Sequence, residues 1–138
     1  MYETEGALGS GAAYIGAIGE GGMDIYHGWF DLKAGTSDTE FARHLAAYMD
    51  HLKAEGRIAG WRLTRRKLGL GPEFLPDFHV MIEVTGLAQL DLAFGEVATR
   101  AGPVEGLHQA VNSRVSRAFF ALYRDFPDPV RVEGEEKF

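Results

Sequence analysis

Two histidines and a carboxylate stand on segments of this sequence that alternate like β-strands. His27 lies within residues 24–33 (DIYHGWFDLK), and His79 and Glu83 lie within residues 78–84 (FHVMIEV). Alternate side chains of a strand share a face, so all three lie opposite the apolar side chains of their strands. A histidine beside a carboxylate suits general acid–base catalysis, because the neighbouring charge adjusts its pKa. We therefore nominate these three residues as catalytic candidates.

The pairing of the two strands decides which of these side chains meet. If Trp29 lies opposite Met81 in an antiparallel pair, His27 lies opposite Glu83. The pair then serves catalysis or ligand binding, holds a divalent metal together with His79, or simply satisfies its own polar groups within an interface. The sequence contains no HExxH or other closely spaced ligand motif, so we expect no metal and no cofactor.

Arg62, Arg65, Arg66 and Lys67 form the only basic run of the chain. Arg62 and Arg66 share one strand face with Thr64, and guanidinium groups bind carboxylates and phosphates well. The structural alternatives are that these charges protect an exposed sheet edge or pair with the acidic tail of a partner chain. The candidate ligand-binding residues are Trp29, Arg62, Arg66 and Met81.

Three further features have weaker patterns. The segment 68–77 is long for a hairpin loop and rich in Gly and Pro, which is typical of a lid or of an arm that clasps a dimer. His108 and Asn112 share one helix face and could reach the mouth of a cavity. His44 and His51 are expected at a helix surface without a chemical role.

The elements that position these residues follow from capping and periodicity. Ser37 followed by Glu40 forms a capping box, and an apolar stripe predicts a helix over residues 38–55. The stripe consists of Phe41, Leu45, Tyr48, Met49 and Leu52. Further strands are expected at 24–33, 58–67, 78–84 and 115–124, and further helices at about 87–102 and 104–113.

This order of elements predicts an α+β, ferredoxin-like βαββαβ domain. Connectivity rules favour a four-stranded antiparallel sheet of order 4-1-3-2, with both main helices on one face. The other face then carries aromatic side chains without cover and needs a partner. Two such sheets packed face to face form a dimeric α/β barrel, so we expect a homodimer.

Several stretches carry a resemblance to known proteins: HGWFDLK, GWRLTRRKLGLGP, FHVMIE, HQAVNS and LYRDFPDP. Over about Met23 to Arg131 the chain resembles a small group of uncharacterised bacterial proteins of the dimeric α/β-barrel, ferredoxin-like superfamily. The resemblance implies the fold and the dimer but no catalytic residue. Other branches of the superfamily include monooxygenases and stress-responsive barrel proteins.

Composition and charge narrow the classes of function. A formal charge of −6 argues against nucleic-acid binding, and no apolar run is long enough to span a bilayer. The chain has no cysteine and no positively charged leader before its first apolar patch, which favours a cytoplasmic protein. We predict a glycine-rich arm at 1–22, a domain at 23–131 and an acidic tail at 132–138. We interpret Met23 as the natural start.

Three functions agree with these patterns. The first is a dimeric barrel that binds a small molecule in its internal cavity. The second is a cofactor-independent enzyme, similar to a monooxygenase or isomerase, that uses His27, His79 and Glu83. The third is a structural or stress-associated interaction protein without a ligand.

Overall fold

A single antiparallel sheet and three helices make up the computed structural model, which describes residues 22–135. The strands are β1 (Asp24–Leu32), β2 (Gly60–Arg65), β3 (Phe78–Val84) and β4 (Val115–Arg124). The helices are α2 (Asp38–Ala54), α3 (Leu87–Ala98) and α4 (Gly102–Asn112). The predicted arm at 1–22 lies, apart from its last residue, outside the described residues.

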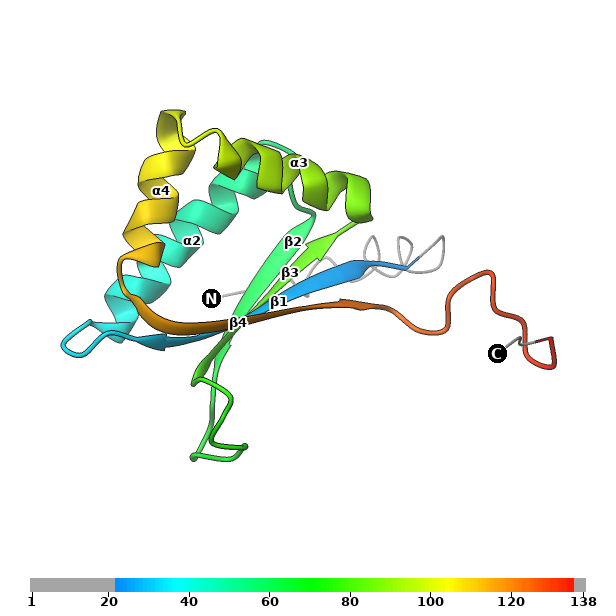
Figure 1. Cartoon of the computed structure of the whole chain (residues 1–138), viewed down its shortest axis with the longest axis horizontal. Coiled ribbons are helices and arrows are strands. Elements are labelled where there is room, and N and C mark those ends of the chain that lie inside the picture. The colour runs from blue at the N-terminus through cyan, green and yellow to red at the C-terminus, as the bar shows by residue number, and fades with distance from the viewer. Residues whose placement is uncertain (1–21, 136–138) are drawn as a thin grey trace.

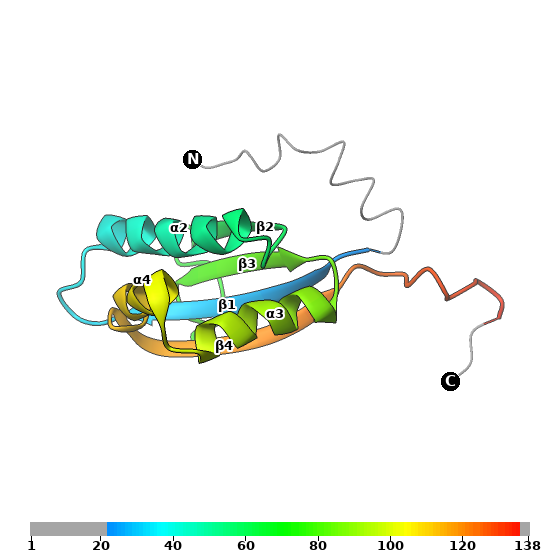
Figure 2. The same cartoon turned by 90° about the horizontal axis from the view of Figure 1, so that it is seen from above.

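The strands are ordered β2-β3-β1-β4, and every neighbouring pair is antiparallel. Within residues 22–135, all three helices cover the same face of the sheet, and the opposite face, here called the open face, carries no helix (Figures 1 and 2). This is the predicted ferredoxin-like α+β fold with the predicted strand order.

A capping hydrogen bond and a glycine determine where helix α2 begins and ends. Ser37 caps the helix, since its hydroxyl accepts a hydrogen bond from the backbone N–H of Glu40 at 3.2 Å. Gly56 follows the last turn with a φ of +72°, a left-handed conformation that glycine adopts without strain. The buried stripe between these ends consists of Phe41, Leu45, Met49 and Leu52.

The core lies between the sheet and the helices, and Gly28 of β1 is part of its packing. A Cβ at Gly28 would come within 2.9 Å of Phe30 Cζ and 3.1 Å of Val80 Cγ1. The missing side chain therefore makes room for neighbouring side chains, which fill the space above the strand.

Several predicted ends differ from the structure. Strand β2 begins later than expected, at Gly60, because Ile58 leaves the sheet to enter the core, where it is 3% exposed, and it ends earlier than expected, at Arg65. The helix predicted near 87–102 ends at Ala98. Among the described residues no helix has the length and apolar character that a bilayer crossing requires.

Candidate functional site

The register between β1 and β3 differs from the expected one by two residues. Trp29 lies opposite His79 and His27 lies opposite Met81, so the predicted pairing of His27 with Glu83 is wrong. The reason lies on the helix side of the sheet, where apolar pairs such as Phe30 with Phe78, both nearly buried, align the strands. A shift of two residues keeps every side chain on its predicted face.

On the open face the register brings the two histidines together. The Nδ1 atom of His27 and the Nε2 atom of His79 lie 2.8 Å apart, within hydrogen-bonding distance. The two imidazole planes differ by 17°, and Trp29 lies nearly parallel to His79 at 4.6 Å between ring centroids. Tyr123 of β4 meets the His27 ring edge-on. The result is a polar pair flanked by the rings of Trp29 and Tyr123.

Partial burial favours the neutral form of both rings of this pair. Partial burial lowers the pKa of His27. Burial also lowers the pKa of His79, and the charge of His27 lowers it further. One ring nitrogen must donate and the other accept, so the pair can hold at most one added proton without losing its hydrogen bond.

Glu83 is not directly opposite either histidine in the strand register. It lies opposite Ile25 of β1 and Gly60 of β2. Its carboxylate lies over Gly60, where an added Cβ would come within 2.9 Å of Oε1. The three nominated catalytic residues therefore comprise a hydrogen-bonded histidine pair and a carboxylate of β3 beside Gly60, where β2 begins.

The basic run is divided as well. Arg62 is exposed and lies opposite Met81, on the strand face that the sequence predicted for it. Arg66 instead turns into the loop 66–77, where its guanidinium donates to Asp77 Oδ1 at 3.1 Å and to the carbonyl oxygens of Pro72 and Leu75. Arg66 therefore holds the loop and does not face the expected barrel.

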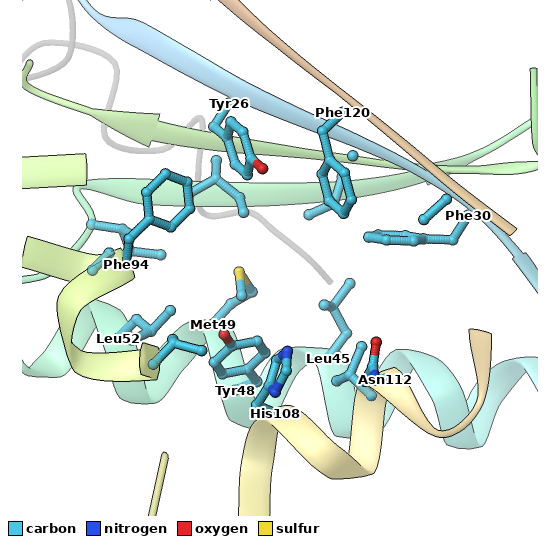
Figure 3. A pocket seen from close by; sticks show the side chains of 18 of the residues that line it. Tyr26, Phe30, Leu45, Tyr48, Met49, Leu52, Phe94, His108, Asn112 and Phe120 are labelled. Carbon is cyan, nitrogen blue, oxygen red and sulfur yellow. The ribbon is translucent and has the colours of Figure 1, made fainter. Parts of the chain in front are cut away.

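A cavity of about 360 Å³ lies on the other side of the sheet, between it and the helices (Figure 3). The sheet contributes Tyr26, Phe30 and Phe120 to one wall, and the helices contribute residues such as Leu45, Met49 and Phe94. None of the seven nominated site residues lines this cavity. Tyr48 belongs to the apolar stripe predicted for residues 38–55, a pattern that indicates packing and does not distinguish a cavity wall from a filled core.

Four side chains give the cavity its polar character: Tyr26, Tyr48, His108 and Asn112. The position of His108 and Asn112 agrees with the weak pattern noted in the sequence. Burial raises the pKa of Tyr26. Burial, the Glu96 charge and Tyr26 together raise the pKa of Tyr48 to about 12. Both phenols therefore remain protonated at neutral pH and can donate hydrogen bonds.

The mouth of the cavity lies toward the edge strand β4. Phe120 of β4 and Phe94 of α3 both line the cavity while remaining 55% and 48% exposed. The Tyr26 ring lies between them, stacked on Phe120 at 5.6 Å and edge-on to Phe94 at 5.3 Å. Three aromatic rings thus border the route into the cavity.

No three metal-ligating side chains gather within residues 22–135. Two histidines alone do not complete the coordination shell of a typical protein-bound transition metal.

Comparison with known families gives one match over most of the chain. A family model described as a family of unknown function, DUF6614, matches residues 23–138. A search of the curated proteins found no match.

Solved structures share the fold at low sequence identity. SnoaB, a cofactor-independent oxygenase from Streptomyces nogalater, has a TM-score of 0.59 at 9% identity, covering 79% of this chain and 98% of SnoaB. A hydroxynitrile lyase from Passiflora edulis has a TM-score of 0.54 at 13% identity, covering 76% and 97%. A dimeric ferredoxin-like protein of unknown function from Thermobifida fusca has a TM-score of 0.52 at 12% identity, covering 76% and 92%. At these identities the likeness establishes the fold alone.

Proposed function

Since the chain belongs to DUF6614, a family without a known function, we propose its function from geometry: it binds a small, largely apolar molecule between sheet and helices. The ligand is a flat, aromatic compound that carries at least one oxygen acceptor. We further propose that the protein works as a homodimer.

The cavity of about 360 Å³ is the observation that carries this proposal. Protein interiors are normally packed with few voids larger than a water molecule. Pockets for small molecules are typically about 300–1,000 Å³, mostly apolar, with a few well-placed polar groups. This cavity has that size and that distribution of groups.

The side chains that line the cavity indicate an aromatic ligand with an oxygen acceptor. The rings of Tyr26, Phe94 and Phe120 offer faces and edges against which a flat aromatic molecule can stack. Tyr26 and Tyr48 remain hydroxyl donors at neutral pH, so they favour a carbonyl or phenolic oxygen on the ligand.

The homodimer is supported by the open face. Phe119 and Tyr123 of β4 are 45% and 60% exposed there, beside Trp29 and the histidine pair. A second copy packed on this face would bury these rings, as two sheets do in a face-to-face pair. The predicted barrel site, with Trp29, Arg62 and Met81, would then lie between the copies.

A second candidate function is cofactor-independent catalysis at the histidine pair. The 2.8 Å contact between His27 and His79 would let one imidazole pass a proton to the other while a substrate binds beside Trp29. Glu83, whose carboxylate lies over Gly60, is not part of this hydrogen bond. This candidate requires the dimer, since the open face alone does not exclude water.

Binding of 1-naphthol, followed by its fluorescence, tests the main proposal. We expect saturable micromolar binding to the wild-type protein. Ala93 is buried and lines the cavity, so Ala93→Phe should weaken binding about tenfold or more, equivalent to about 1.4 kcal/mol. The control is Ala47→Phe, at an exposed position of α2 outside the cavity lining.

Circular dichroism establishes that both variants are folded. If Ala93→Phe does not fold, Val97→Phe blocks the same cavity from the next turn of α3. Equal affinity in the blocked and control variants, or no saturable binding to the wild-type protein, contradicts the proposal.

A further inference from the structure

Two elements of the chain expose apolar side chains that nothing in residues 22–135 covers. The first is the β2–β3 loop, residues 66–77, where Leu68, Leu70 and Phe74 are 82%, 76% and 68% exposed. The second is the segment after β4, residues 125–135, here called the C-terminal segment. Its exposed apolar residues are Phe126, Val130 and Val132.

The β2–β3 loop has a defined shape. The Arg66 guanidinium joins the carbonyl oxygens of Pro72 and Leu75 to the Asp77 carboxylate. The backbone N–H of Asp77 donates to Asp31 of β1 at 3.0 Å, which attaches the loop base to the sheet. A loop held this way loses little further freedom on binding, so its exposed apolar residues are suited to an interface.

The two elements cannot meet within one copy of the chain. The loop follows Arg65 at the end of the sheet where β1 finishes, whereas the C-terminal segment follows Arg124 at the end where β1 begins. Strands β2 and β4 are also the opposite edges of the sheet. Figure 1 shows the loop extending from the sheet on the side away from the helices and the C-terminal segment leaving at the other end.

Their charges are complementary. Lys67 at the base of the loop and Arg62 on β2 are exposed cations. The C-terminal segment carries the exposed carboxylates Glu133 and Glu135. The C-terminal segment carries a net negative charge, since its four carboxylates outnumber Arg131. The loop itself carries no net charge, because Glu73 and Asp77 balance Arg66 and Lys67, so the complementarity rests on Lys67 and the neighbouring Arg62.

We propose that the β2–β3 loop of one copy packs against the C-terminal segment of a second copy. A two-fold axis in the plane of the open face, perpendicular to the line that joins the loop to the C-terminal segment, places each loop over the other copy's C-terminal segment. The same contact then forms twice. The strands of the two sheets then cross at a large angle, as in orthogonal sheet packing. This inference rests on the proposed homodimer and specifies how its two copies pack against each other.

Disulfide trapping tests the contact, because the natural chain contains no cysteine. We expect the double variant Leu70→Cys/Val132→Cys to form a covalent dimer on mild oxidation, visible on a non-reducing gel. The control is Leu70→Cys/Ala47→Cys, whose second position lies on exposed α2, and it should remain non-covalent. Peptide mapping should find residue 70 joined to residue 132 of the other copy.

Light scattering before oxidation separates this inference from the homodimer itself. A non-covalent dimer that gives no 70-to-132 disulfide overturns the proposed arrangement and leaves the homodimer standing. A monomer at micromolar concentration overturns both. As a second measurement, Leu70→Ser/Phe74→Ser should weaken dimerisation about tenfold or more, and an unchanged dissociation constant contradicts the contact.

Discussion

His27 Nδ1 and His79 Nε2 share a hydrogen bond of 2.8 Å on the open face of the sheet. Strand register alone brings them together, because His27 lies diagonally from His79 across β1 and β3. Protonation of both imidazoles breaks this bond, because one of the two nitrogens must accept it. Protonation of a histidine beside a carboxylate instead strengthens their bond.

The first prediction is that stability falls as the solution is acidified. Burial lowers the pKa of both histidines in the folded state, so below the unfolded value of about 6.5 the unfolded chain binds more protons. The contribution is fully present above that pH and is lost progressively as pH falls toward the folded pKa values. Urea denaturation at fixed protein concentration, between neutral and acidic pH, measures it.

The double variant His27→Phe/His79→Phe should flatten this pH dependence. His44→Gln, outside the pair, should keep the wild-type slope. An identical slope in all three proteins would show that other groups cause the acid sensitivity.

The second prediction concerns the open face. Replacing Trp29 by Asp places a charge at the centre of the proposed interface, where an unpaired buried charge is strongly unfavourable. We expect light scattering to change from dimer to monomer at micromolar concentration. Lys53→Asp, on the exposed side of α2, is the control and should leave the mass unchanged. A dimeric Trp29→Asp protein would place the interface elsewhere.

The third prediction concerns the donor role of Tyr48 in the cavity. Its pKa of about 12 keeps the hydroxyl protonated, so Tyr48→Phe removes a donor and little volume. Binding of 1-naphthol should weaken by about 0.5–1.5 kcal/mol, as for one hydrogen bond. Naphthalene, which lacks the oxygen, should bind both proteins equally. Equal losses for the two compounds would mean that the hydroxyl acts through packing alone.

The fourth prediction compares Gly28, which is closely packed, with Gly95, which has open space around it. Gly28→Ala should destabilise the protein by about 1–3 kcal/mol, since its Cβ would come within 2.9 Å of Phe30 and 3.1 Å of Val80. Gly95→Ala, within α3 and without an atom inside 4 Å of its Cβ, should stabilise it by about 0.5–1 kcal/mol. Thermal unfolding of both variants checks the two signs, and a neutral Gly28→Ala would contradict the close packing.

The fifth prediction compares two arginine–aspartate pairs. Asp24 is 3% exposed, and its Oδ1 lies 2.5 Å from Arg124 Nε, so Arg124→Met leaves a buried carboxylate without its cation. We expect this variant to lower the free energy of unfolding by more than Arg117→Met does. Arg117→Met frees the more exposed Asp31 and should cost less than about 1 kcal/mol. Similar losses would mean that burial of Asp24 is not decisive.

Periodicity and capping determined most of the fold. The apolar stripe of α2, the Ser37 cap and the alternation of β1 and β3 are local patterns, and each appears in the structure as predicted. The face of each strand residue was also predictable, because a strand side chain alternates with period two whatever its partner.

Only the tertiary structure decided which residues meet. A shift of two in register preserves every face, so the sequence could not distinguish His27 beside Glu83 from His27 beside His79. Arg66 does not lie on the predicted strand face, because its guanidinium binds carbonyl oxygens of the folded loop. Apart from the shared helix face of His108 and Asn112, no sequence feature indicated this cavity, since a void is the volume that packed side chains leave unfilled. Tyr26 and Tyr48 border it only after sheet and helices meet.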